Sequence, residues 1–306
     1  MRYYFAPMEG LTDSIYRREH HRFFGGVDRY YMPFFSPTVH RTFTSREARE
    51  LPKADSVPFC AVPQVLTNDP ENFLWAAEAC RDLGYAEINL NAGCPSGTVV
   101  AKRKGSGMLR ELDSLASFFD RIFAKSPLPV SVKTRLGMEE PEEFEKILAL
   151  YNRYPIRELI VHPRVRRQFY EGQVQIEWFR YAAEHTAIPL CYNGDIRSLS
   201  DAAAPEAQFP GLEAVMVGRG LIADPGMLAG GTEIDTLEAF LNALMDDYTE
   251  EFSGCRNALF RMKENWAYLH NRFAGSDKLW KQMRKTTDAA QFRALSAQVL
   301  HTCPLV

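Results

Sequence analysis

The residues most able to do chemistry begin in the stretch Glu87–Pro95, Glu-Ile-Asn-Leu-Asn-Ala-Gly-Cys-Pro. Its isoleucine and leucine alternate with polar residues, which is the period of a half-buried strand. Gly93 then permits a sharp change of backbone direction, and Pro95 cannot continue a ladder of strand hydrogen bonds. Cys94 is therefore predicted to lie on a turn just past a strand end, where its thiol could act as an acid, a nucleophile or a metal ligand. The ordinary alternative is a small buried hydrophobic residue, as most free cysteines are.

Other ionisable, amide and glycine residues follow further strand-like runs in the same way. Each has an ordinary structural explanation when taken alone: a cation can be a solvated strand end, a histidine can be hydrogen bonded in a core, and a glycine can form a plain turn. Their recurrence at one kind of position favours function. These residues are Pro7-Met8-Glu9, Gln64, Asn91, Lys133 and Arg135, His162 and Arg164, Asn193-Gly194-Asp195, and Gly218-Arg219-Gly220.

Strand-like and helix-like segments alternate through the first 235 residues and must position these side chains. Helical periodicity is clear in residues 72–83, 112–123 and 142–151, and Asp69-Pro70 and Glu140-Pro141 are typical helix starts. This alternation predicts a (β/α)8 TIM barrel. An open doubly wound sheet is the alternative, but the G-x-G-x-x-G turn expected after its first strand is absent. The predicted strands are 2–7, 27–33, 58–65, 86–91, 129–134, 158–162, 188–193 and 213–218.

The strand signal stops near residue 236. Leu259, Met262, Trp266, Leu269 and Phe273 recur at the spacing of an amphipathic helix, and further helical segments follow at 276–285 and 288–300. We therefore predict two domains, a catalytic barrel over 1–235 and a small all-helical domain over 236–306.

The overall composition narrows the class of protein. Hydrophobic residues make up 46% and charged residues 25% of the 306 residues, as in ordinary soluble globular proteins. The six cysteines show no paired spacing, so neither a disulfide framework nor a metal site is expected. No apolar run is long enough for a signal peptide or a membrane span. We expect a cytoplasmic protein with reduced thiols, and a monomer.

In a barrel, the carboxyl ends of the strands meet at one face, where barrel enzymes build their active sites. The glycine-bearing turns at Asn193–Asp195 and Gly218–Gly220 follow the last two strands, the usual place for a phosphate site, and Arg219 adds a positive charge. Lys133, across the barrel, could stabilise negative charge on a reduced ring, and the amide of Gln64 matches an imide edge. A ring with a phosphate, an imide edge and an anionic reduced state describes FMN.

The same residues carry a family resemblance that runs over the whole chain in order and spacing. The chain resembles the tRNA-dihydrouridine synthases. The motifs are Ala-Pro-Met-Glu-Gly-Leu-Thr-Asp (6–13), Gln64, Asn-Ala-Gly-Cys-Pro (91–95), Gly-Ser-Gly-Met-Leu (105–109), Val-Lys-Thr-Arg-Leu-Gly (132–137), Val-His-Pro-Arg (161–164), Tyr-Asn-Gly-Asp-Ile (192–196) and Val-Gly-Arg-Gly (217–220).

The resemblance implies an FMN barrel with a tRNA-binding helical domain, which reduces uridine to 5,6-dihydrouridine with NADPH, or NADH, as electron donor. Hydride would pass from the flavin N5 to C6 of uracil, and Cys94 would give a proton to C5. Asn91 and Arg135 would hold the target base. The implied FMN contacts are Pro7, Met8, Glu9, Gln64, Lys133, His162, Asn193, Gly194, Asp195, Gly218 and Arg219.

Local basic clusters could hold an RNA backbone although the net charge is −3. Residues 254–285 carry eight Lys and Arg, among them Lys281 and Arg284, against Glu264 and Asp277 only. Lys102 and Lys104 follow Cys94, and Arg164 follows the sixth strand. Any one of these charges could simply be part of a solvated face. Trp266 and Phe273 lie on the apolar stripe and are expected in the core.

Two rival functions remain open. A flavin enzyme of the dihydroorotate-dehydrogenase kind would act on a free pyrimidine and would have no use for a basic helical domain. A non-catalytic RNA-binding barrel would not depend on flavin. Two departures from the family pattern, Pro163 after the histidine and Ala92 before Gly-Cys-Pro, concern the shape of the base pocket and so the choice of target uridine.

Overall fold

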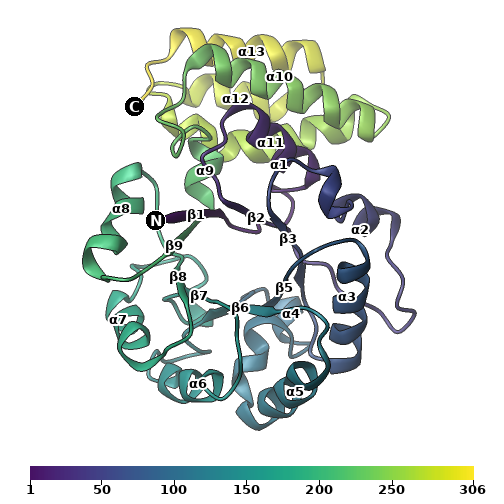
Figure 1. Ribbon diagram of the computed structural model, residues 1–306. Coiled ribbons are helices and arrows are strands. Elements are labelled where there is room, and N and C mark those ends of the chain that lie inside the picture. Colours follow the sequence, from purple (N-terminus) through teal and green to yellow (C-terminus); the bar gives the residue numbers. More distant parts are fainter.

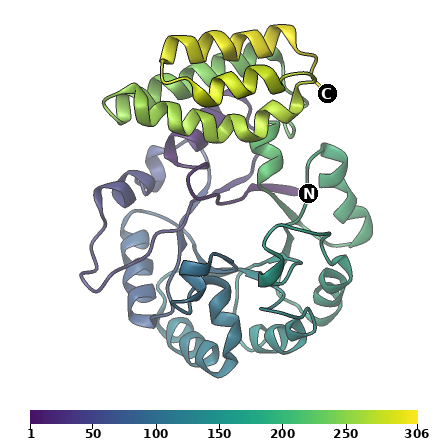
Figure 2. The same ribbon diagram turned by 180° about the vertical axis from the view of Figure 1, so that it is seen from behind.

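The computed structural model describes residues 1–306, and its first part is a ring of parallel strands surrounded by helices (Figures 1 and 2). Neighbours around the ring follow the order β3-β2-β1-β9-β8-β7-β6-β5-β4. The TIM-barrel prediction is confirmed. The strands are β1 (Arg2–Phe5), β2 (Arg29–Tyr31), β3 (Ala61–Val62), β4 (Gln64–Val65), β5 (Ile88–Ala92), β6 (Val130–Arg135), β7 (Leu159–His162), β8 (Leu190–Tyr192) and β9 (Ala214–Val217).

The ring has nine strands rather than eight because Pro63 interrupts the third predicted strand. Proline has no N–H to donate, so the ladder breaks between β3 and β4. β3 pairs with β2, and β4 pairs with β5, where the carbonyl of Pro63 still accepts a hydrogen bond from the Asn89 N–H at 2.9 Å. The continuous segment 61–65 thus joins both neighbours and closes the barrel.

Helices cover the outside of the ring. Asp69 caps α3 by accepting from the Asn72 N–H, with Pro70 in the first turn, as predicted. α6 begins at Glu143, just after the predicted start, because Glu140 to Glu142 form a turn. The barrel helices are α1 (Ser14–Phe23), α2 (Ser45–Glu50), α3 (Pro70–Asp82), α4 (Gly97–Val100), α5 (Leu112–Lys125), α6 (Glu143–Tyr151), α7 (Ile176–His185), α8 (Leu199–Gln208) and α9 (Arg219–Ala223), with 3-10 turns at Ala54–Ser56, Gly105–Arg110 and Arg166–Gln168.

The inside of the barrel is filled near the amino ends of the strands. Tyr4 and Tyr31 are fully buried, and both hydroxyls donate to the carboxylate of Glu158, at 2.9 and 3.2 Å. Val62, Ile160 and Cys191 pack with the two tyrosines. This plug leaves space inside the barrel only toward the carboxyl ends of the strands.

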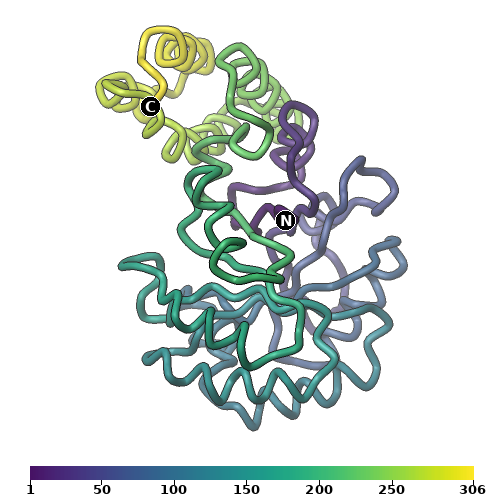
Figure 3. The backbone as a smooth tube through the Cα atoms, turned by 60° about the vertical axis from the view of Figure 1, so that its left-hand side comes forward, coloured from purple at the N-terminus to yellow at the C-terminus, as the bar shows by residue number.

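The chain ends in four helices that lie together beside the barrel, against α1 and α9 (Figures 1 and 3). They are α10 (Ile234–Glu251), α11 (Cys255–Leu269), α12 (Asp277–Lys285) and α13 (Ala289–Thr302), with a 3-10 turn at His270–Arg272. Trp266 and Phe273 are buried, as predicted. The apolar core runs without a break from barrel residues such as Tyr16 to Phe240 of α10. The division into domains at residue 236 stays a prediction.

None of the helices combines the length and the apolar character needed to cross a membrane.

Candidate active site

A cavity of about 450 Å³ opens at the carboxyl ends of the strands. Most of the residues predicted for the site lie around it, although they come from six different strand ends and are far apart in sequence. Of the predicted residues, its wall contains Pro7, Met8, Glu9, Asn91, Cys94, Lys133, Arg135, His162, Asn193, Gly194, Asp195, Gly218 and Arg219.

Asn91 forms the turn that presents Cys94. Its side-chain oxygen accepts hydrogen bonds from the N–H groups of Gly93, at 3.1 Å, and Cys94, at 2.9 Å. An asparagine that bonds the backbone two and three residues ahead is a common way to fix a tight turn. The thiol is thus held by the turn rather than by a regular strand.

The segment Gly105–Ser106 packs directly on this turn. Both the backbone N–H and the hydroxyl of Ser106 donate to the Cys94 carbonyl, at 3.1 and 2.8 Å. Gly105 has φ +57°, and a Cβ there would come within 2.9 Å of both the Cβ and the carbonyl oxygen of Cys94. Only glycine fits this position, which explains the start of the 105–109 motif.

The thiol of Cys94 and the amine of Lys133, both in the cavity wall, have shifted pKa values. Burial raises the pKa of Cys94 and outweighs the opposite effects of its backbone hydrogen bond and of the cations Arg135 and Lys133. Burial, reinforced by Arg135, lowers the pKa of Lys133 to about 8. At neutral pH the site therefore presents a protonated thiol beside a lysine that is still mostly charged.

Gln64 is buried beneath the cavity and its amide is engaged by neighbouring amides. Its Nε2 donates to Asn89 Oδ1 at 2.7 Å, and its Oε1 accepts from Asn91 Nδ2 at 2.8 Å. Asn89 in turn donates to Ser131 at 2.8 Å. This ladder joins β4, β5 and β6 and orients Asn91. Gln64, predicted to meet an imide edge, is here a support for the Cys94 turn.

Arg135 clamps two loops together. Its Nε donates to the carbonyl of Gly93 at 3.0 Å, and its Nη1 donates to the carbonyl of Val165 at 3.1 Å. The side chain is only 2% exposed, and its guanidinium lies 5.3 Å from the ring centre of Tyr170. Nη2 makes no bond to the backbone and can serve a ligand in the cavity.

Arg164, predicted to contact RNA, lies beneath the cavity wall at 1% exposure. It forms a two-pronged ion pair with Asp195, whose carboxylate also accepts from Arg219 at 3.0 Å. Arg164 Nη1 also lies 3.0 Å from His162 Nε2. Because arginine only donates, Nε2 must accept, and the ring proton of neutral His162 is on Nδ1. Burial and Arg135 keep the pKa of His162 far below its ordinary value.

Close packing explains why glycine occupies the two positions predicted to bind phosphate, Gly194 and Gly218. A Cβ on Gly194 would lie 2.7 Å from Val174 Cγ1, and one on Gly218 would lie 3.3 Å from Met8 Sδ. Asn193 donates to the carbonyl of Met216 at 2.8 Å, which ties the ends of β8 and β9 together.

Several further side chains of the cavity wall do not stand out in the sequence, among them Tyr170, Arg197, Phe34 and Tyr268. Tyr170 lies in the long loop after β7, where no periodicity predicts orientation. Tyr268 belongs to α11, so a helix of the C-terminal part contributes directly to the cavity. The sequence signal that could have found Tyr268 is its position one residue before Leu269, which belongs to the apolar stripe of this helix.

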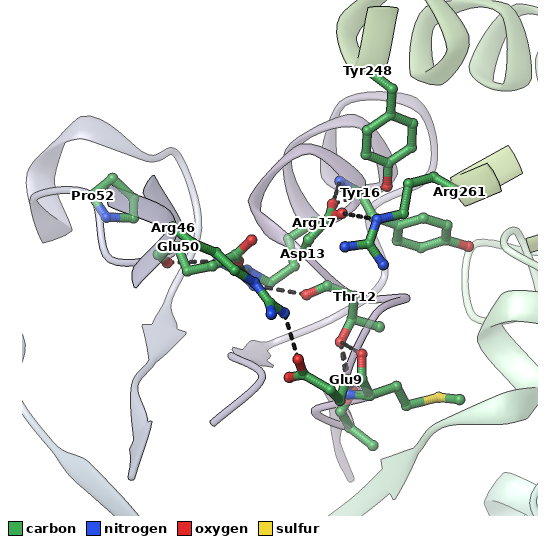
Figure 4. Close-up of polar contacts among 12 residues, drawn as sticks. Glu9, Thr12, Asp13, Tyr16, Arg17, Arg46, Glu50, Pro52, Tyr248 and Arg261 are labelled. Atoms are coloured by element: carbon green, nitrogen blue, oxygen red, sulfur yellow. Dashed lines mark hydrogen bonds and ion pairs between the residues drawn. The ribbon is translucent and has the colours of Figure 1, made fainter. Parts of the chain in front are cut away.

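Figure 4 shows how the C-terminal helices contact the loop after β1, which forms part of the cavity wall. Arg261 of α11 donates to the carbonyl of Gly10 at 2.6 Å, and Tyr248 of α10 donates to Asp13 at 2.9 Å. Asp13 also caps α1 through the Tyr16 N–H, and burial raises its pKa. Glu9 pairs with Arg46 of α2. The residues 7–10 are thus fixed from outside the barrel.

The remaining residues predicted to bind RNA lie outside the cavity. Lys281 and Arg284 are exposed on α12, and Lys102 is exposed in the loop after Cys94. Lys104 is half-buried, and its pKa is lowered by burial and by Lys102. Nowhere do three or more His, Cys, Asp or Glu side chains come together in a way that could hold a metal ion.

Comparison of the fold with solved structures gives similar folds at low sequence identity. Morphinone reductase matches with a TM-score of 0.53 over 74% of this chain and 84% of the other, at 12% identity. An old yellow enzyme homologue from Zymomonas mobilis matches with a TM-score of 0.50 over 73% of this chain and 86% of the other, at 13% identity. These similarities confirm the barrel fold.

Sequence comparison is more specific. The chain is 31% identical over 226 residues to a probable tRNA-dihydrouridine synthase of Rickettsia bellii, which covers 73% of this chain and 68% of the relative. It is 27% identical over 312 residues to the tRNA-dihydrouridine(16) synthase of Neisseria meningitidis serogroup B, covering 96% of this chain and 93% of the relative. Residues 4–302 match the family described as dihydrouridine synthase (Dus). With the cysteine turn and the cavity in place, the chain belongs to the dihydrouridine synthase family.

Proposed function

We propose that this protein reduces uridine in tRNA to 5,6-dihydrouridine, with FMN as cofactor and NADPH as electron donor. The observation that carries the proposal is the thiol of Cys94, kept protonated on a rigid turn at the wall of a cavity rich in cations. Family membership supports the same reaction. NADH is the alternative donor, and a monomer acting in the cytoplasm is part of the proposal.

The charges of the cavity fit FMN. Each of its two acids has an arginine partner outside the wall, Glu9 with Arg46 and Asp195 with Arg164, and Asp195 also accepts from Arg219. Lys133, Arg135 and Arg219 therefore leave an excess of positive charge, which suits a phosphate and an anionic reduced ring. We propose that Arg219 faces the phosphate and that Lys133 faces the ring, with His162 donating from Nδ1. When bound, FMN supplies the hydride that C6 of uracil receives.

The protein supplies position and a proton. Cys94 donates its thiol proton to C5 of uracil, a role that needs the acid form that burial preserves. Asn91 and Arg135 each keep a donor after fixing the turn, and we propose that these hold the base. Because the turn, the amide ladder and the arginine clamp are already formed, little reorganisation is needed when substrate binds.

The test begins with purified protein. Its cofactor is released by denaturation, and its mass should be that of FMN. Fresh protein is then reduced with NADPH without oxygen and mixed with unmodified tRNA, uridine or orotate. We expect rapid flavin reoxidation and dihydrouridine only with tRNA, at positions mapped by sequencing. Faster reoxidation by orotate would favour the free-pyrimidine enzyme, and protein that binds no added FMN would favour the non-catalytic barrel.

We also propose that residues 236–306 form the tRNA-binding domain, with α12 as part of its surface. Reversing the exposed charges Lys281→Glu and Arg284→Glu together should raise the tRNA dissociation constant about 10-fold or more and flatten its salt dependence. Flavin reduction by NADPH should not change. The matched control reverses Lys125 and Lys146, which are exposed on α5 and α6. If both double variants lose tRNA affinity equally, the affinity depends on the net charge of the protein and not on the surface of α12.

A further inference from the structure

Phe169 has a backbone conformation that an aromatic residue rarely adopts. Its φ is +49° and its ψ is −99°, outside the small left-handed region open to ordinary residues. Such a conformation costs free energy and persists only where the surrounding structure imposes it. A glycine would adopt it without the steric cost.

The surrounding loop imposes it from both sides. The side-chain oxygen of Gln168 accepts from the Val165 N–H at 3.0 Å and from Gln175 Nε2 at 2.9 Å. On the other side, buried Arg164 donates to the carbonyl of Gly172 at 2.5 Å. The chain between these anchors must reverse within a few residues, and Phe169 takes the strained position.

The reversal sends two neighbouring aromatic rings in different directions. Tyr170 lines the cavity, with the guanidinium of Arg219 5.2 Å from its ring centre. Phe169 is 41% exposed, and the guanidinium of Arg166 lies 5.0 Å from its ring centre. Arg166 Nε donates to the carbonyl of Pro95 at 3.3 Å, directly after Cys94. Arg166, which forms no ion pair, therefore links the ring of Phe169 to the turn that carries Cys94.

We propose that the exposed ring of Phe169 is a stacking surface for a nucleobase adjacent to the uridine that enters the cavity. This inference rests on the proposed function, since it needs an RNA substrate. A uridine that leaves the stack deprives its neighbours of a stacking partner, and an exposed flat ring can replace it. Arg166 adds the positive charge that the flanking phosphates attract. A partly exposed ring on a strained backbone does little for folding, so its position points to a ligand.

The experiment compares four substitutions of Phe169 in the full-length holoenzyme. Phe169→Trp keeps a flat ring, and Phe169→Leu keeps apolar bulk without the ring. Phe169→Ala removes the ring but keeps the backbone strain. Phe169→Gly removes both the ring and the strain. Each is measured for tRNA dissociation constant, kcat/KM on unmodified tRNA, flavin reduction by NADPH and thermal unfolding. Leu199→Ala, which shortens an exposed side chain on α8, is the control.

We expect the Phe169→Trp variant to bind tRNA as the wild type does, with quenching of the new indole fluorescence. The leucine, alanine and glycine variants should bind about 10-fold more weakly, the amount expected for loss of one stacked base. Phe169→Gly should melt at a higher temperature than Phe169→Ala. Flavin reduction should match the wild type throughout, and the Leu199 control should bind normally.

Two results would overturn the inference in different ways. Wild-type affinity and turnover in Phe169→Leu, with an active parent enzyme, would show that the ring does not stack and would leave the proposed function intact. A wild-type protein that neither binds nor reduces tRNA would remove the proposed function and this inference together.

Discussion

Replacing Cys94 by alanine should slow dihydrouridine formation by about 10²–10⁴-fold, the usual contribution of a positioned general acid. The structure gives the reason. The thiol lies on a turn fixed by Asn91 and Ser106, and burial raises its pKa so that it holds its proton at neutral pH. Neither contact depends on the sulfur atom, so the variant should fold, bind FMN and accept electrons from NADPH as before.

The measurement is a single turnover. Flavin is reduced, excess NADPH is removed, and reoxidation by unmodified tRNA is followed without oxygen. Cys94→Ser keeps a similar size but is a much weaker acid, so it should also be slow. Cys60→Ala is the matched control, because Cys60 is exposed just before β3, at the end of the barrel opposite the cavity. Equal dihydrouridine yield and rate in Cys94→Ala would mean that the proton comes from another group.

The pH dependence has a definite sign. Cys94 acts as an acid, so its contribution is present below its pKa and is lost as the pH rises through it. Because burial raises that pKa, the single-turnover rate should stay level through neutral pH and fall only above the ordinary thiol range, about 8.5. Lys133, with a pKa of about 8, loses its charge earlier. The profile is therefore measured at saturating FMN, which separates the rate from cofactor binding.

The barrel could be predicted from the sequence because each strand is a short local run with its own turn signals. All eight predicted strands overlap an observed strand, and the interruption at Pro63 follows from the missing N–H of proline. Residues at the strand ends could likewise be placed around one cavity, since parallel strands bring their carboxyl ends to one face.

The partners of those residues could not be predicted, because they come from distant parts of the chain. Gln64 and Asn91 are amides whose hydrogen bonds are used on each other and on the cysteine turn. Arg164 follows its strand like a surface cation, yet its side chain turns inward to Asp195, 31 positions away. The orientation of Tyr170 depends on the strained conformation of the preceding residue, which no local propensity favours.

Among the substitutions predicted for this protein, removal of the Asp195 carboxylate should have the largest effect on the free energy of unfolding. Arg164 is buried and Asp195 is its only ion-pair partner. Taking away one member of a buried pair leaves an uncompensated charge, so Asp195→Ala should lower the free energy of unfolding by about 3–5 kcal/mol. Asp195 also has φ +46°, a conformation that asparagine tolerates better than alanine. Asp195→Asn should therefore be less destabilising than Asp195→Ala.

Urea unfolding of the two variants checks this, with Asp82→Ala as the control. Asp82 pairs with Arg81 on the surface, where both side chains are exposed, and its loss should cost about 0–1 kcal/mol. The double variant Arg164→Met, Asp195→Ala removes both charges and should recover part of the stability lost in Asp195→Ala alone. If Asp195→Ala unfolds at the wild-type urea concentration, the backbone carbonyls that accept from Arg164 are enough to stabilise its buried charge. Asp195 would then be free to contact FMN directly, as the sequence predicts.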